Sequence, residues 1–103
     1  MNENITLNEV VARFLTLSVS QKQLFLATYA SELTILARGH FLDKDYELAR
    51  QCNESIHRIT GHIASLARRP EAAPDESFID MIVKSAARKG WGDLVLRSLK
   101  MDL

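Results

Sequence analysis

The residues from Ala49 to Leu66, ARQCNESIHRITGHIASL, decide the fold class of this sequence. Apolar side chains recur in them at alternating spacings of three and four, at Ala49, Cys52, Ile56, Ile59, Ile63 and Leu66. This spacing places the apolar side chains on one face of an α-helix and is typical of a coiled-coil seam. The sequence therefore predicts a long helix, capped by Asp43 or Asp45, that continues to about Arg68.

Toward the N-terminus, the same helical periodicity predicts two further helices. The first follows Thr6, whose spacing from Glu9 is that of a capping box. The second is expected to begin at a similar pair, Ser20 and Gln23, and to end just before Gly39, which supplies a left-handed residue. Because only two or three residues separate these helices, they are expected to pack as an antiparallel pair.

Toward the C-terminus, residues 69–74 (RPEAAP) form the one clear linker of the sequence. Pro70 ends the preceding helix, and Pro74 is expected at the first position of a fourth helix that ends at Gly90. A short fifth helix is expected from about Asp93. No hairpin turn signal or period-2 alternation appears. The sequence predicts an all-α, single-domain bundle of four to five helices over residues 1–103, expected to be dimeric.

Composition excludes several classes of function. Thirteen basic residues balance thirteen acidic ones, which argues against a nucleic-acid-binding protein. No apolar run reaches the roughly 20 residues of a membrane-spanning helix, and the first residues do not resemble a secretory signal. The single cysteine, Cys52, fits a reducing compartment, so a cytoplasmic location is expected.

One alternative function is a metal-binding bundle. Glu54 and His57 form a Glu-x-x-His pair, which di-iron carboxylate bundles use in duplicate. A homodimer would supply two such pairs, with Glu32 of each subunit as the remaining carboxylate. On a helical wheel, however, Glu54 lies opposite the apolar seam, so the plainer interpretation is a solvated pair one turn apart.

A second alternative is a ribonuclease or nucleic-acid-binding regulator. Arg50 and His57 lie seven residues apart on one helical face, where an Arg binds phosphate and a His transfers a proton. Residues 81–101 add five basic side chains against one acidic side chain. The plainer interpretation is that the basic residues complement helix C-termini. His62 flanks the apolar seam and is interpreted as a partly exposed structural histidine.

The leading hypothesis is association through apolar helix faces, because the chain has more apolar surface than about 100 residues enclose easily. Leu24 and Ile35 lie off the main apolar arc of the second helix, close together on its expected solvent side. The predicted interface residues are Leu24, Ile35, Ile56, Ile59, Ile63 and Leu96. The sequence thus predicts a homodimer, or an adaptor that binds another protein. It contains no catalytic triad pattern, phosphate loop or zinc-ligand cluster, so neither catalysis nor a cofactor is expected.

Overall fold

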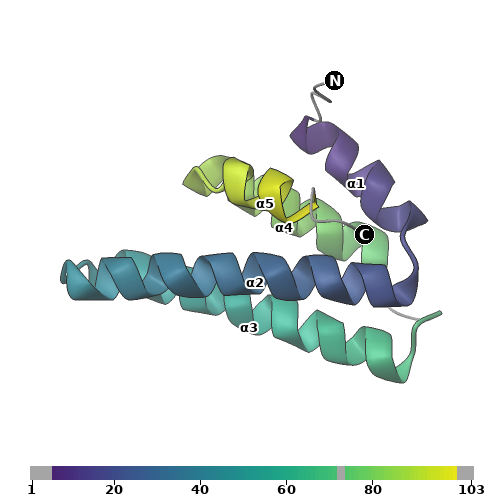
Figure 1. Cartoon of the computed structure of the whole chain (residues 1–103), viewed down its shortest axis with the longest axis horizontal. Helices are drawn as coiled ribbons and strands as arrows, with labels where there is room; N and C mark the ends of the chain where they lie inside the picture. The colour runs from purple at the N-terminus through teal and green to yellow at the C-terminus, as the bar shows by residue number, and fades with distance from the viewer. Residues whose placement is uncertain (1–5, 72–73, 100–103) are drawn as a thin grey trace.

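The computed structural model describes residues 6–71 and 74–99, and these form five α-helices with no strand among them (Figure 1). The helices are α1 (Leu7–Thr16), α2 (Val19–Leu42), α3 (Tyr46–Arg68), α4 (Asp75–Lys89) and α5 (Gly92–Leu99). The predicted all-α bundle is confirmed, and the last helices are close to their expected places. Pro74 was expected at the first helical position of α4, and it is instead the N-cap, one residue before the helix begins.

The two longest helices, α2 and α3, form an antiparallel hairpin that extends beyond the rest of the molecule at its turn (Figure 1). The prediction that α2 ends before Gly39 is wrong, because the helix continues through this glycine to Leu42. The left-handed residue of the turn is instead Lys44, with a φ of 64°. Asp45 then caps α3 as predicted, by accepting a hydrogen bond from the backbone N–H of Leu48.

The start of α2 also differs from the prediction. Its capping box is formed by Ser18 and Gln21, two residues before the predicted pair. The hydroxyl of Ser18 accepts from the Gln21 backbone N–H at 3.2 Å, and the Gln21 side chain accepts from the Ser18 N–H at 3.0 Å. Both pairs have the same spacing, so spacing alone did not separate them. At α1 the predicted box is also wrong, since the Thr6 hydroxyl donates to the Glu9 carboxylate rather than accepting from the backbone.

The predicted antiparallel pairing of α1 with α2 is wrong as well. Leu17 and Ser18 adopt extended backbone conformations, and α1 packs against α4 and α5 instead (Figure 1). Its contact with α2 is made near its end, where the Phe14 and Phe25 rings meet edge to face at 5.8 Å. The molecule therefore has two layers, the α2–α3 hairpin and the group of α1, α4 and α5.

The hydrophobic core lies between these layers and receives side chains from all five helices. Its fully buried members include Val10, Phe14, Phe25, Leu26, Leu33, Ile59, Ile79 and Val95. The C-terminus of α4 closes as predicted, with Gly90 in the left-handed region at a φ of 77°. The next residue, Trp91, is buried and donates its backbone N–H to the carbonyl of Ala86. It thus completes the cap of α4.

Candidate interaction surface

The exposed side of α2 is unusual because it carries almost no charge. All 24 residues of this helix are described, and eleven of them are exposed. Arg38 is the only one of these eleven with a charged side chain. The other Lys and Glu residues of α2 turn inward: Lys22 pairs with Asp75 at 2.6 Å, and Glu32 lies 3.4 Å from Arg97. The surface that remains is made of apolar, small and hydroxyl-bearing side chains.

The centre of this surface is a regular strip, which we call the open strip. Its members follow one another at spacings of four, three, four, three and four residues: Leu24, Thr28, Ser31, Ile35, Arg38 and Leu42. At about 100° per residue, all six point within about 40° of one direction, opposite the buried residues of α2. Leu24 is 42% exposed, Ile35 70% and Leu42 71%. The hydroxyl of Thr28 donates to the Leu24 carbonyl, so it is satisfied within the helix.

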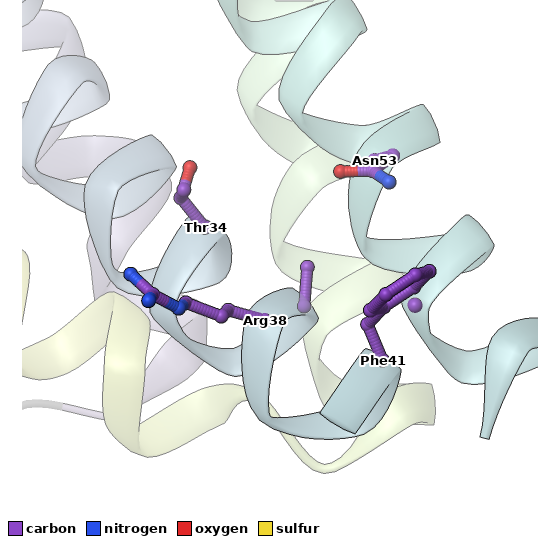
Figure 2. Close-up of a pocket in the computed structure, with 6 residues that line it drawn as sticks. Thr34, Arg38, Phe41 and Asn53 are labelled. Carbon is purple, nitrogen blue, oxygen red and sulfur yellow. The ribbon is translucent and has the colours of Figure 1, made fainter. Parts of the chain in front are cut away.

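The hairpin turn adds a second exposed apolar group, next to the end of the open strip. The rings of Phe41 and Tyr46 pack edge to face at 5.3 Å, and both are more than half exposed. Beside them lies a shallow groove of about 270 Å³ between α2 and α3. Figure 2 shows Phe41 on α2 and Asn53 on α3, with the Arg38 side chain extending away from both. The groove is lined by Thr34, Ala37, Arg38, Phe41, Ala49 and Asn53.

The structure separates the six residues of the predicted interface. Leu24 and Ile35 lie together on the open strip, as the helical wheel predicted. Ile59 is fully buried inside the chain, and the remaining three are partly buried against the core: Ile56, Ile63 and Leu96. The apolar seam of α3 is therefore used largely within the chain, where α2 packs against it. Of the six residues, only Leu24 and Ile35 are exposed, and both belong to α2.

The residues of the metal-binding alternative point to different neighbours. Glu32 faces Arg97, whereas Glu54 accepts a hydrogen bond from Arg50 at 2.8 Å on the exposed side of α3. His57 is exposed on the same helix. Within residues 6–71 and 74–99, no group of three or more His, Cys, Asp or Glu side chains is arranged to hold a metal. A single chain thus brings no metal-binding set together in this part of the sequence.

The ribonuclease alternative depends on Arg50, and this guanidinium is held by two acidic neighbours. It donates to Glu47 one turn before it and to Glu54 one turn after it. The hydrogen bond from Arg50 lowers the pKa of the Glu47 carboxyl. Arg50 thus belongs to a chain of surface ion pairs along α3.

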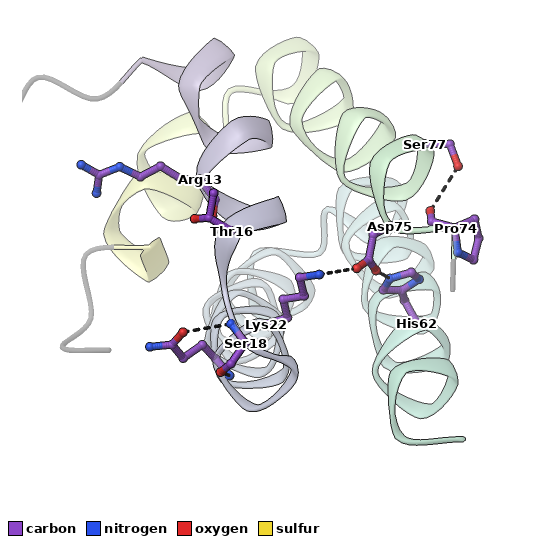
Figure 3. Close-up of polar contacts among 9 residues, drawn as sticks. Arg13, Thr16, Ser18, Lys22, His62, Pro74, Asp75 and Ser77 are labelled. Atoms are coloured by element: carbon purple, nitrogen blue, oxygen red, sulfur yellow. Dashed lines mark hydrogen bonds and ion pairs between the residues drawn. The ribbon is translucent and has the colours of Figure 1, made fainter. Parts of the chain in front are cut away.

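A buried polar network, which the sequence did not predict, joins three helices at the other end of the hairpin. Figure 3 shows Lys22 of α2 and His62 of α3 directed at the carboxylate of Asp75 in the first turn of α4. Each of the two nitrogens, Lys22 Nζ and His62 Nε2, lies 2.6 Å from one carboxylate oxygen. The His62 ring stacks on Phe78 with 3.9 Å between centroids. His62 is therefore a buried structural residue and not a partly exposed one.

This network shifts the pKa of the Asp75 carboxyl group. Burial alone would raise the pKa of Asp75, but the hydrogen bonds with Lys22 and His62 outweigh burial and lower it. Asp75 is thus held as a charged carboxylate by a lysine and a histidine from the other layer. The signal in the sequence was the spacing of His62 from Ile59 and Leu66, which places all three on the buried face of α3. No local pattern identified Asp75 as its partner.

Comparison with known proteins adds no relative: no protein-family model, curated protein or solved structure matches the chain. Among the described residues, none of the helices has both the length and the apolar character that crossing a membrane requires. Among the described residues, the open strip of α2 and the neighbouring turn form the most distinctive surface.

Proposed function

We propose that this protein acts by self-association, with the open strip of α2 as its interaction surface. The observation that carries this proposal is the nearly uncharged exposed side of a 24-residue helix. A surface helix normally carries charged and polar residues on the face opposite its apolar stripe. Here α3 and α5 pack against α2, and the open strip remains uncovered.

A second copy of the chain is the occupant to which the proposal commits. Most oligomers are symmetric assemblies of one chain, in which the same patch is used on both subunits. A formal net charge of zero lets two copies approach without long-range repulsion. The same uncharged surface on both copies would remove the exposed apolar side chains of both from water.

The test is the oligomeric state of the wild-type chain and of the Ile35→Glu variant, measured by sedimentation equilibrium. Ile35 is 70% exposed and is not part of the core, so the variant should fold normally. We expect the dissociation constant to rise by at least about 30-fold, because a central apolar residue of an interface contributes about 2 kcal/mol or more. The matched control is Ala87→Glu, at an exposed position of α4, which should leave association unchanged.

Two results would overturn the proposal. One is a wild-type chain that stays monomeric at every concentration measured. The other is a dimer that Ile35→Glu and Ala87→Glu affect equally. Native mass spectrometry of protein purified without chelators adds a further readout. A dimer mass carrying two or more metal ions would instead support the bundle that uses Glu32, Glu54 and His57.

A further inference from the structure

We infer that two copies of α2 pack face to face and antiparallel, around a two-fold axis at the level of Leu33. This inference rests on the self-association proposed above and adds its orientation and register. Three described features carry it. They are the distribution of large and small side chains along the open strip, the position of its single charge, and the location of the exposed turn.

The side-chain sizes along the open strip complement each other in this register. Leu24 at one end faces Leu42 of the partner subunit, so the large side chains at the two ends meet in pairs. Ile35, which is the large residue nearest the middle, faces Ser31 of the partner subunit. A large side chain thus packs over a small one on both sides of the axis, which lets the two helices approach closely there.

The single charge of the open strip also fits an antiparallel arrangement. Arg38 lies five residues from the axis, so the two guanidiniums belong to α-carbons about 15 Å apart along the helices, at 1.5 Å per residue. Each Arg38 lies at the level of Thr28 of the partner subunit, which carries no charge. Neither arginine therefore opposes a like charge.

A parallel two-fold dimer would use the same surface less well. Each residue would then face its own counterpart, which places the two Arg38 side chains together and the two Ser31 side chains together. Like charges directly opposite each other are destabilising, and paired serines leave poorly filled space between two Ile35 layers. The strip therefore favours the antiparallel arrangement in both size and charge.

The exposed turn lies next to the contact in this arrangement. Phe41 and Tyr46 pack against each other next to Leu42, and the antiparallel register places Leu42 beside Leu24 of the partner subunit. The partner's Leu24 lies near the start of α2, where the exposed surface is again uncharged. The exposed Leu24 and Leu42 side chains at the two ends of α2 thus cover each other, next to the exposed turn.

Cysteine cross-linking tests the register directly. Leu24→Cys and Leu42→Cys chains are prepared separately, mixed in equal amounts, allowed to exchange subunits and treated with a short bis-maleimide. Antiparallel packing brings the two introduced thiols together only in mixed dimers, so the mixture should cross-link and neither variant alone should. In an antiparallel dimer of either variant alone, the two introduced cysteines are about 27 Å apart along the helices, too far for the reagent. The native Cys52 is fully buried, and the wild-type chain is the control for its reactivity.

The outcomes separate the orientation and register of the dimer from self-association itself. Cross-linking of either variant alone indicates parallel packing and overturns the inference. Dimers that sediment normally but do not cross-link in the mixture overturn the register while the proposed self-association stands. A wild-type monomer overturns both. If the cysteine substitutions themselves weaken the dimer, Thr28→Cys mixed with Arg38→Cys applies the same criterion at a second facing pair.

Discussion

The helices α2 and α3 have nearly the same length, 24 and 23 residues, and pack against each other, yet their outer surfaces are opposite in character. The exposed side of α3 is charged, with Glu47, Arg50, Glu54, Arg58 and Arg68. That of α2 carries Arg38 alone among its charged residues. α3 is therefore an ordinary amphipathic surface helix, with an apolar face toward the core and a charged face toward water. α2 has a buried face and an exposed face with almost no charge.

The largest expected effect on stability comes from a substitution in the hydrophobic core, where both helices bury one face. Ile59→Ala removes a fully buried side chain from the core of α3. We expect the free energy of unfolding to fall by about 2–5 kcal/mol, because the substitution loses buried apolar surface and leaves a cavity. Urea denaturation of the variant at one protein concentration measures this. A loss no larger than that of an exposed substitution such as Ala87→Ser would contradict the described core.

An intermediate effect is expected at the end of the hairpin where both helices are joined to α4. Asp75→Asn removes the charge that Lys22 and His62 share, and leaves the Lys22 ammonium partly buried without its counter-ion. We expect a loss of about 1.5–3 kcal/mol in the free energy of unfolding near neutral pH, the range for hydrogen bonds to charged groups. Asp80→Asn is the matched control, since Asp80 pairs with the exposed Lys84 in the same helix.

The difference in stability between the wild type and Asp75→Asn is expected to depend on pH. Because the folded pKa of Asp75 is lowered, its contribution to stability is complete above the ordinary aspartate pKa of 3.8. The contribution is lost as the pH falls through the folded pKa. The difference in stability between the wild type and Asp75→Asn should therefore shrink below about pH 4. A difference that stays constant down to pH 2 would show that the variant acts through packing and not through the charge.

The smallest effect is expected on the charged surface of α3. Arg50→Ala removes exposed ion pairs to Glu47 and Glu54, and such pairs contribute little to stability. We expect thermal unfolding close to that of the wild type. The pKa of Glu47 should rise toward its ordinary value, since the hydrogen bond from Arg50 lowers it. Carboxyl titration by NMR measures this, and an unchanged Glu47 pKa would mean that the two side chains do not pair in solution.

The periodicity of apolar residues predicted features that depend on a single helix, namely its position and its buried face. The spacing of apolar residues located α3 and its buried face, and Pro70 and Gly90 marked helix ends by their backbone preferences. The positions of Leu24 and Ile35 on the outer side of α2 followed from the same helical wheel. These properties are local, so one segment of sequence contains them.

The properties that depend on two segments were not predicted. The sequence predicts a helix end at Gly39, but α2 continues past it to Leu42, where Phe41 packs against Tyr46 of α3. A glycine inside a helix costs only about 1 kcal/mol, so it does not by itself end one. The placement of α1 depends on α4 and α5, more than 50 residues later in the chain. His62 and Asp75 are separated by a linker, and only the meeting of the two layers brings them together. No spacing rule connects such residues.

Gly39 has a further consequence for motion in the hairpin. It lies inside the last turns of α2, where a side chain would begin more than 4 Å from any atom outside its own stretch of helix, so no packing neighbour requires a glycine there. A glycine weakens a helix interior, and the exposed turn beyond it extends past the other layer (Figure 1). The backbone amides of this end of α2 should therefore exchange with solvent through local opening, well before those near Leu33. The outermost part of the proposed contact surface is thus the part of the long helix that opens most easily.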